Sequence, residues 1–300
     1  MKKIFIIGSD SFIARKFIHA NNKKYAFRSV ARTITGIDNE VVIQDFSQIS
    51  YESFRDIDII INFAAIVHRL DVKDEPIYDE VNYKLTVLNA TKAKQAGVKL
   101  FIQLSTVAVY GKASYVSYNT PVNPENPYAR SKLKADEALL SMQDGNFKVC
   151  ILRPPMVYGG GKSPGNMMRL IGLSNKAFPL PFKGIDNKRD FINVNNLIQY
   201  ISAIAEKQLS GIYLVTDHEP VSTEHLLLTI SKYLGKKTML IKLPGWILKL
   251  LKFIRPGDFD KLFGTMQIES NFPDENLINR HSIEDGIREM VNSIDKTKGN

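Results

Sequence analysis

The fold of this chain is decided close to its start, by the stretch Ile4-Phe5-Ile6-Ile7-Gly8-Ser9-Asp10-Ser11-Phe12-Ile13-Ala14. The apolar run predicts a buried strand, Gly8 a tight turn, and the residues from Ser11 onward a helix. Free N–H groups at such a helix start bind anions, and dinucleotide-binding folds place a pyrophosphate there. Those folds carry three glycines where this chain has Gly8, Ser11 and Ala14. The stretch predicts a dinucleotide site with contacts from Gly8, Ser11, Phe12 and Ile13; an ordinary strand–helix turn is the alternative.

Further buried strands alternate with helices through the first half of the chain. Near-continuous apolar runs predict strands at residues 4–7, 25–30, 41–43, 57–63, 101–104 and 149–152. Apolar spacing of three and four residues predicts helices over 12–20, 79–96 and 128–142. Strands joined by crossover helices form parallel sheets, so we predict an α/β fold with a doubly wound, Rossmann-type parallel sheet.

The pattern changes after about residue 154, where Pro- and Gly-rich loops begin. Helix-like segments at 194–206 and 223–234 and a strand-like segment at 212–215 follow. We therefore expect a dinucleotide-binding domain over residues 1–155, re-entered by about 190–216. A smaller substrate-binding lobe takes most of 156–300 and is interleaved with the first domain.

Composition excludes several classes of protein. The chain has 300 residues, 44% of them hydrophobic, and a single cysteine, Cys150, which excludes an internal disulfide. It has neither an apolar run of membrane-spanning length nor a signal-peptide core, so we expect a cytoplasmic protein. Its net charge of +9 is concentrated in residues 232–262, which hold eight Lys or Arg and two Asp. The rest is near balance, which argues against nucleic-acid binding.

The end of the second predicted strand bears on the choice of cofactor. NAD sites usually place an acidic residue there for the ribose 2′-hydroxyl, whereas NADP sites tend to place Arg against the 2′-phosphate. Arg32 occupies this position and no carboxylate appears before Asp38. The sequence therefore favours NADP(H), with NAD(H) possible; a solvated arginine at a strand end is the alternative.

A tyrosine and a lysine form the candidate catalytic pair. Tyr128 and Lys132 are spaced i, i+4 and so share one face of a predicted helix. A lysine ammonium near a phenol favours phenolate and lowers the phenol's pKa, which allows proton exchange with an alcohol or carbonyl oxygen. Upstream, Ser105 and Thr106 follow a predicted strand and bring a hydroxyl to the edge where open α/β sheets bind ligands.

Several motifs in order resemble the extended short-chain dehydrogenase/reductases, a superfamily of nucleotide-sugar epimerases, dehydratases and ketoreductases. Besides the turn at Gly8, they are Asn62-Phe63-Ala64-Ala65, Val81-Asn82, Leu104–Gly111, Tyr128–Lys132, Arg153–Gly159 and Arg189–Val194. The resemblance covers about residues 3 to 216. It implies an enzyme whose acid/base is Tyr128, activated by Lys132, with Thr106 bonding the reacting sugar oxygen.

The same resemblance implies the binding residues. Phe63, Ala64 and Ala65 would line the cofactor, Asp45 would face the adenine, and Pro154 with Val157 would flank the nicotinamide. Lys132 would also bind the nicotinamide ribose. The expected substrate contacts are His68, Thr106, Val107, Asn166 and Arg189, the last two at the nucleotide diphosphate. Arg189 also suits bidentate bonding to phosphate.

Within the superfamily the chain resembles a bacterial branch that makes amino-sugar nucleotides for surface polysaccharides. Two reactions fit: reduction of a UDP-4-keto-6-deoxy-N-acetylhexosamine, or 4-epimerization of UDP-N-acetylglucosamine or UDP-glucose with tightly bound NAD. Arg32 favours the reductase. A non-catalytic NADP-binding scaffold or sensor is the alternative from another class, and the presence of Thr106, Tyr128 and Lys132 argues against it.

Three further expectations concern metals and partners. No histidine or cysteine has metal-ligand spacing, so no metal is expected. The resemblance implies a homodimer formed by residues 79–96 and 128–142. The basic, apolar-rich residues 246–255 predict a helix, which either lies on an anionic membrane surface or packs against the sugar-binding lobe.

Overall fold

A computed structural model describes residues 1–67, 75–163, 165–176, 179–254 and 256–295. Seven strands form one parallel sheet in the order β10-β7-β5-β4-β1-β2-β3. They are β1 (Lys3–Ile7), β2 (Ala26–Ala31), β3 (Glu40–Val42), β4 (Ile59–Asn62), β5 (Leu100–Leu104), β7 (Lys148–Arg153) and β10 (Gly211–Leu214). The strand order reverses direction between β1 and β4. The predicted doubly wound, Rossmann-type fold is therefore confirmed, with its ligand crevice expected at this reversal.

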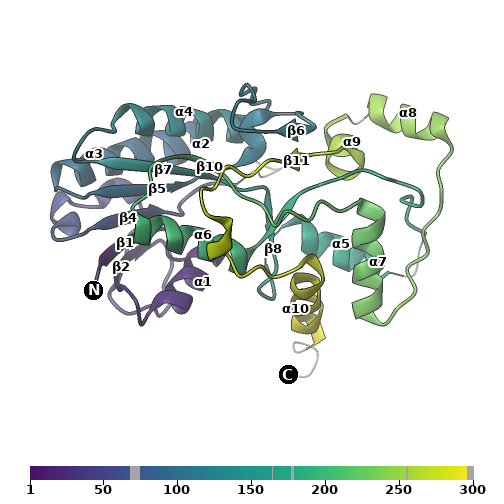
Figure 1. Ribbon diagram of the computed structural model, residues 1–300, viewed down its shortest axis with the longest axis horizontal. Coiled ribbons are helices and arrows are strands. Elements are labelled where there is room, and N and C mark those ends of the chain that lie inside the picture. Colours follow the sequence, from purple (N-terminus) through teal and green to yellow (C-terminus); the bar gives the residue numbers. More distant parts are fainter. Residues whose placement is uncertain (68–74, 164, 177–178, 255, 296–300) are drawn as a thin grey trace.

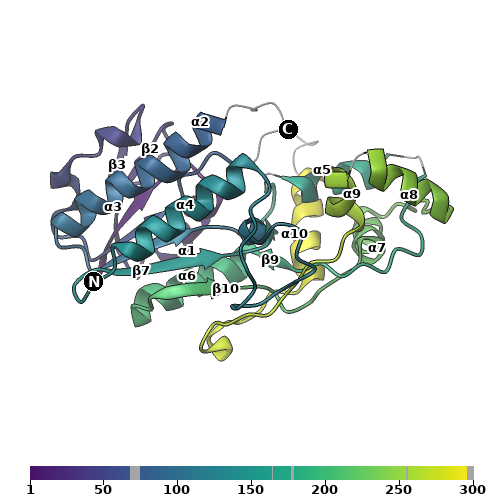
Figure 2. The same cartoon turned by 90° about the horizontal axis from the view of Figure 1, so that it is seen from above.

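Helices cover both faces of the sheet (Figures 1 and 2). On one face α1 (Phe12–Asn21) packs beside α6 (Val194–Lys207), and on the other α3 (Leu85–Gln95) packs beside α4 (Pro127–Ser141). Each face has its own core, one around Phe17, Ile61 and Ile201, the other around Phe54 and Phe101. Burial on both faces explains why these strands are continuously apolar.

The helix predicted over 79–96 is irregular in its first part. It consists of a π-helical segment η3 (Asp79–Lys84) followed by α3, and the short helix α2 (Glu75–Tyr78) directly precedes it. π-Helical insertions commonly occur at functional sites. Here the insertion carries Asn82, a fully buried residue beside α4.

A smaller lobe contains five helices of the described chain, placed to the right in Figure 1. They are α5 (Asn166–Ser174), α7 (Thr223–Leu234), α8 (Gly245–Ile254), α9 (Pro256–Phe263) and α10 (Ile283–Asp295). Met167, Ile171, Leu226, Ile230 and Ile287 belong to a core shared by α5, α7 and α10. Two short parallel pairs link this lobe to the large one: β8 (Met156–Tyr158) with β9 (Phe191–Asn193), and β6 (Tyr115–Val116) with β11 (Gln267–Ile268).

The connecting segments carry short 3₁₀ helices. These are η1 (Phe46–Gln48), η2 (Tyr51–Phe54), η4 (Val107–Tyr110) and η5 (Glu275–Leu277). Over the described ranges, the chain contains no helix that combines the length and apolar character needed to cross a membrane.

Candidate active site

The turn between β1 and α1 is formed by close backbone contacts. The N–H groups of Gly8 and Ser9 both donate to Val30 O, at 2.9 and 3.0 Å. Gly8 has φ +81°, and a Cβ there would lie 2.8 Å from the backbone of Ala64. Ser11 caps α1 because its Oγ accepts from Ala14 N at 3.2 Å. The turn therefore brings β1, β2 and the segment after β4 together at the start of a helix.

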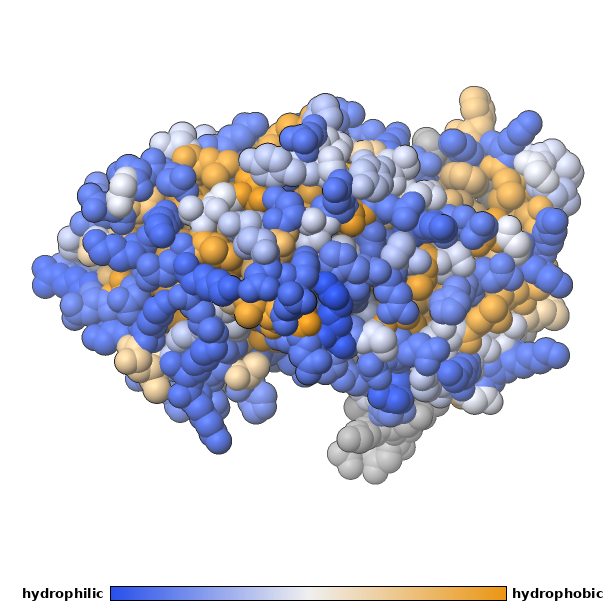
Figure 3. Space-filling view, in the orientation of Figure 1, coloured by the Kyte–Doolittle hydropathy of each residue, from blue (hydrophilic) through white to orange (hydrophobic). Residues whose placement is uncertain are grey.

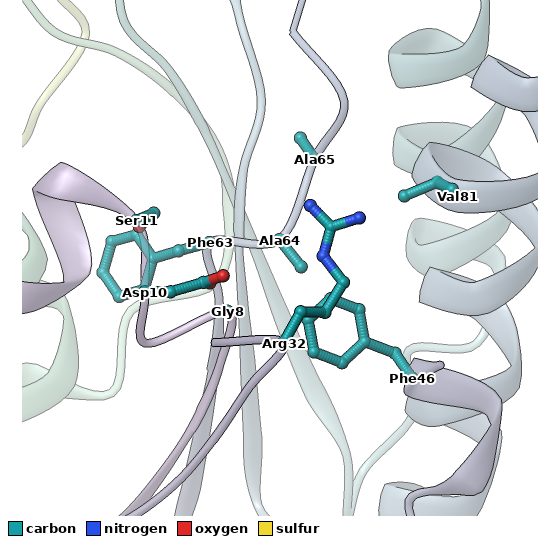
Figure 4. Close-up of a pocket in the computed structure, with 9 residues that line it drawn as sticks. All are labelled: Gly8, Asp10, Ser11, Arg32, Phe46, Phe63, Ala64, Ala65 and Val81. Atoms are coloured by element: carbon teal, nitrogen blue, oxygen red, sulfur yellow. The ribbon is translucent and has the colours of Figure 1, made fainter. Parts of the chain in front are cut away.

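A pocket opens at this junction (Figure 4). It is lined by Gly8, Asp10, Ser11, Arg32, Phe46, Phe63, Ala64, Ala65 and Val81. Six of these residues are predicted cofactor contacts; Asp10, Phe46 and Val81 were not predicted. The pocket measures about 180 Å³, less than the 300–1,000 Å³ typical of small-molecule sites, so it accounts for only part of a dinucleotide site.

Charged groups enter the pocket from two sides. The Arg32 guanidinium points across it between Ala65 and Val81, and the Asp10 carboxylate points in from the turn (Figure 4). Below the turn, Ser9 Oγ donates to Glu40 Oε1 at 2.6 Å. Sequence reasoning missed Glu40 because strand pairing, not sequence distance, brings β3 to the turn.

The other predicted cofactor residues do not line this pocket. Asp45 is exposed, and its Oδ1 accepts from Ser47 N at 2.8 Å. It thereby caps η1, which begins at the pocket residue Phe46. Phe12 and Ile13 in the first turn of α1 are half-buried against the core. Pro154 is buried after β7, and Val157 is half-buried in β8.

Two asparagines connect the pocket to α4, the helix that carries the candidate catalytic pair. Asn62 Oδ1 accepts from Ala64 N at 3.1 Å. Asn82 Oδ1 accepts from Ile66 N at 2.8 Å, and its Nδ2 donates to Ile66 O and to Ser131 Oγ, both at 3.0 Å. These bonds hold the segment after β4 to α4, next to Lys132. Asn62 and Asn82, each from a motif named in the sequence analysis, therefore have a structural role in shaping the pocket wall.

Thr106, Tyr128 and Lys132 lie together at the end of β5 and the start of α4. Thr106 caps η4 because its Oγ1 accepts from Ala108 N at 3.1 Å. Tyr128 lies in the first turn of α4 and contacts the buried Tyr78 ring edge-on, with centroids 6.5 Å apart. Lys132 is 1% exposed, and its Nζ donates to Leu104 O at 2.6 Å. The three side chains predicted to react therefore share one sheet edge.

The pKa values of the pair differ from the expectation drawn from spacing alone. Burial raises the pKa of Tyr128 to about 12, although hydrogen bonding with Thr106 opposes this rise. Burial lowers the pKa of Lys132 to about 8, opposed by the charge of Asp136. The predicted lowering of the Tyr128 pKa by Lys132 is therefore wrong for the protein alone, because the ammonium is directed at a carbonyl and burial dominates.

A buried carboxylate lies beneath the pair. Asp136 is fully buried one turn after Lys132; its Oδ2 accepts from Ser105 Oγ at 2.7 Å and from Arg153 Nε at 3.0 Å. Arg153 is 4% exposed and also donates to Tyr110 Oη at 2.8 Å. Sequence reasoning missed Asp136, although its i+4 position from Lys132 places it on the same helix face.

The predicted substrate residues are spread over both lobes. Val107 is buried, and its N–H donates to Pro154 O at 3.1 Å. Asn166 is exposed at the first residue of α5. Arg189 Nη1 donates to Asp260 O at 3.0 Å and to Gly264 O at 3.1 Å, so part of its guanidinium stabilises the end of α9. His68 lies outside the described residues.

The donor set suits a dinucleotide. A helix N-terminus, a glycine cradle that a Cβ would fill, and a cation meet beside a Thr–Tyr–Lys group. Among the described residues, no group of three or more His, Cys, Asp or Glu side chains is arranged to hold a metal ion.

Comparison with known proteins identifies the family. Residues 4–215 match the NAD dependent epimerase/dehydratase family. The chain belongs to this family. This epimerase/dehydratase-family enzyme is 31% identical over 295 residues to a UDP-glucose 4-epimerase of Vibrio cholerae, covering 92% of the chain and 90% of the relative.

A more distant relative and two solved structures extend the comparison. An N-acetyl-alpha-D-glucosaminyl-diphospho-ditrans,octacis-undecaprenol 4-epimerase of Escherichia coli O157:H7 is 23% identical, covering 80% of this family member and 75% of the relative. The UDP-glucuronic acid 4-epimerase from Bacillus cereus in complex with NAD has a TM-score of 0.79 at 21% identity, and the match covers 98% of this chain and 99% of the solved chain. The UDP-Glc/GlcNAc 4-epimerase from Campylobacter jejuni has a TM-score of 0.77 at 22% identity, and the match covers 99% of this chain and 100% of the solved chain. At these identities the structures show the fold of the epimerase/dehydratase-family enzyme.

Proposed function

We propose that this enzyme interconverts the C4 epimers of a UDP-hexose or UDP-N-acetylhexosamine with NAD(H) retained in the site. The observation that carries the proposal is the Thr106–Tyr128–Lys132 group at the sheet edge, beside a pocket with dinucleotide-binding features. The Vibrio cholerae relative, named as a UDP-glucose 4-epimerase, matches nearly the whole chain and supports this reaction. The names of the relatives above give no support to the 4-keto-sugar reductase favoured by the sequence.

The chain's residues perform the proton transfers of this reaction. Tyr128, as phenolate, takes the proton of the sugar C4 hydroxyl while Thr106 Oγ1 hydrogen-bonds the same oxygen. A nicotinamide cofactor held by Gly8, Ser11, Arg32 and Ala64 would supply the redox chemistry, taking up the hydride removed from C4 as the alcohol becomes a ketone and returning it to the ketone carbon. Inversion requires the 4-ketone to present its opposite face before Tyr128 returns the proton to oxygen. Substrate contacts must therefore hold the diphosphate while releasing the ring, a role that suits Asn166 and Arg189.

Activation of Tyr128 needs a charge near its oxygen. Its pKa of about 12 in the protein alone makes phenolate rare at neutral pH. Lys132 now donates to the Leu104 carbonyl; if its ammonium instead bonded the hydroxyls of a bound cofactor, it would be free to stabilise the Tyr128 phenolate.

The charges around the pocket favour NAD over NADP in this proposal. Arg32 alone would attract a 2′-phosphate, but Asp10 in the pocket and Glu40 beneath the turn repel additional negative charge. The second candidate is an NADPH-dependent 4-keto-sugar reductase, because Arg32 is placed to bind a 2′-phosphate.

One experiment separates the two candidates. The purified enzyme is denatured, and released cofactor is identified by mass spectrometry; native enzyme is then incubated with UDP-glucose or UDP-N-acetylglucosamine without added cofactor, and with a UDP-4-keto-6-deoxy sugar plus NADPH. We expect bound NAD and formation of the C4 epimer. Stoichiometric NADPH consumption with the keto sugar, and no epimer, would establish the reductase instead.

We also propose a homodimer built from residues 79–96 and 128–142 of each copy. α3 and α4 lie side by side on one face of the sheet, and α3 exposes Leu88 there (38% exposed) (Figure 2). Two such pairs would form a four-helix bundle. Light scattering after chromatography should give a mass near 68 kDa, roughly twice the 33.9 kDa chain. Leu88→Glu should shift it to the monomer, and a monomeric parent would refute this interface.

A further inference from the structure

The helix α8 presents an apolar stripe to solvent. Trp246, Leu250, Phe253 and Ile254 are 68%, 48%, 85% and 62% exposed. Their spacing of four, three and one residues places them on one side of the helix. Ile247, which lies next to Ile254 on the helix surface, and Leu248, on the opposite side, are half-buried, and α8 contacts α9. Packing against the lobe therefore accounts for Ile247 and Leu248 but not for the exposed stripe.

Basic side chains accompany the stripe. Lys249 borders it, Lys252 lies farther round the helix, and Lys242 precedes the helix, all of them exposed. The described part of the chain gives these three lysines no carboxylate partner. Lys252 Nζ lies 6.0 Å from the centroid of the Phe259 ring of α9, so this exposed lysine is on the side of α8 that faces α9. Lys249 therefore supplies the positive charge that borders the stripe, and Lys242 adds a second positive charge just before the helix.

Size and charge indicate what can cover this surface. A ten-residue helix is about 15 Å long, so its stripe is far smaller than the roughly 800 Å² that each partner buries in a stable protein interface. Helices with large apolar residues on one side and flanking lysines bind instead in the plane of an anionic membrane surface. Figures 1 and 3 place α8 at the outer end of the small lobe, where hydrophobic and hydrophilic residues mix.

We propose that α8 docks this enzyme on bilayers that contain anionic lipids. The helix axis lies parallel to the membrane, Trp246, Leu250, Phe253 and Ile254 enter the headgroup region, and Lys249 with Lys242 contacts lipid phosphates. Docking is connected to the small lobe's interior, because α9 packs on α8 and its carbonyl end is held by Arg189. The stripe itself contains none of the residues assigned to the reaction proposed above.

The chain carries its own probe, because Trp246 is its single tryptophan. Full-length enzyme is titrated with vesicles of phosphatidylglycerol and phosphatidylcholine, or of phosphatidylcholine alone, while tryptophan emission and co-sedimentation are followed. We expect a blue shift and co-sedimentation with the anionic vesicles only, both weakened by salt because surface charges are screened. Headgroup-labelled nitroxide lipids should quench the emission.

Matched variants locate the contact. Leu250→Ser should weaken vesicle binding by at least about fivefold, since it removes a leucine from the membrane. Leu228→Ser, at a 51% exposed leucine of α7, should leave it unchanged. Lys249→Gln should cost roughly fivefold, because each lysine near an anionic surface contributes about that factor. Lys99→Gln, at an exposed lysine before β5, should cost nothing.

Three results would overturn the proposal. The first is absence of binding to anionic vesicles by protein that is folded by circular dichroism. The second is a contact outside the stripe, seen either as equal weakening by Leu228→Ser and Leu250→Ser or as binding without any change in Trp246 emission. The third is a blue shift that grows with protein concentration in the absence of lipid, together with a rise in mass that Leu250→Ser abolishes, which would assign the stripe to a second copy of the chain.

Discussion

At the scale of single residues, Asp136 balances the charges below the reacting pair. It is fully buried between two nearly buried cations, Lys132 and Arg153. Burial raises its own pKa, opposed by Arg153 and Lys132. Its Oδ1 has no hydrogen-bond partner among the described residues, so the attachment of Asp136 depends on the groups around Oδ2. Asp136 therefore has two effects: it stabilises the fold as the counter-charge of Arg153, and its charge favours the protonated form of Lys132.

Asp136→Asn should therefore have two measurable effects. It leaves Arg153 buried without a counter-charge, so the free energy of unfolding in urea should fall by about 3–5 kcal/mol. It also removes the negative charge that raises the Lys132 pKa, which should drop below its present value of about 8. Because protonated Lys132 supports the phenolate, the alkaline limb of the kcat profile should move to lower pH. The double variant with Arg153→Met should lose less stability than the sum of the single variants; additive losses would contradict a coupled pair.

Tyr128→Phe tests the proton-transfer role directly. Removing the phenol oxygen eliminates general acid/base catalysis, and kcat should fall by roughly 10²–10⁴-fold. Cofactor content should stay unchanged, because the pocket residues lie on other elements. Tyr118→Phe is the control, since this tyrosine is 60% exposed and precedes α4 in the chain. A Tyr128→Phe enzyme within a few-fold of the parent would remove Tyr128 from the mechanism.

At the scale of elements, the β1–α1 turn depends on close approach as well as on backbone conformation. Gly8 and Gly97 have nearly the same φ, +81° and +84°. A Cβ at Gly8 would meet the backbone of Ala64 at 2.8 Å, whereas a Cβ at Gly97 would meet no atom within 4 Å. The two positions therefore separate conformational strain from steric exclusion.

Gly97→Ala should cost about 1 kcal/mol of unfolding free energy, the cost of a left-handed alanine. Gly8→Ala should cost clearly more and weaken dinucleotide binding, because Ala64 must move out of the pocket wall. Chemical denaturation and titration with NAD measure the two effects. Equal losses of stability with unchanged NAD affinity would show that the approach of Ala64 has no role.

The elements were predictable where one rule dominated. The strands of the sheet follow from their continuous apolar runs, and α1, α4, α6 and α7 follow from apolar periodicity; α4 carries the candidate pair Tyr128 and Lys132 in its first two turns. The predictions failed where tertiary contacts decide. No helix was predicted over α10, whose Gly286 is needed for close packing, because a Cβ there would lie 2.4 Å from the Tyr158 ring. Similarly, strand pairing brings Glu40 to the turn, and burial reverses the expected shift of the Tyr128 pKa.

At the scale of the whole molecule, the two lobes meet at a buried polar junction. Asp217 receives hydrogen bonds from Tyr158 Oη at 2.8 Å, Asn196 Nδ2 at 2.7 Å and the N–H of Asn193 at 3.0 Å. These partners come from β8, α6 and β9, and Asn196 Nδ2 also donates to His281 O just before α10. One carboxylate therefore joins elements of the large lobe to elements of the small lobe.

This junction should make stability depend on pH. Burial raises the pKa of Asp217 to about 6, despite the hydrogen bonds that favour its ionised form. Between about pH 4 and pH 6 the folded protein therefore holds a proton that the unfolded chain has released, so the contribution of Asp217 to stability declines as pH rises through this window and is level above it. The decline should reach roughly 3 kcal/mol, since each pKa unit corresponds to about 1.4 kcal/mol. Asp217→Asn cannot titrate, so the unfolding free energy of the parent minus that of the variant, measured in urea, should fall by this amount from pH 4 to pH 7. Parallel curves would mean that Asp217 is already ionised at pH 4 and that its hydrogen bonds outweigh burial.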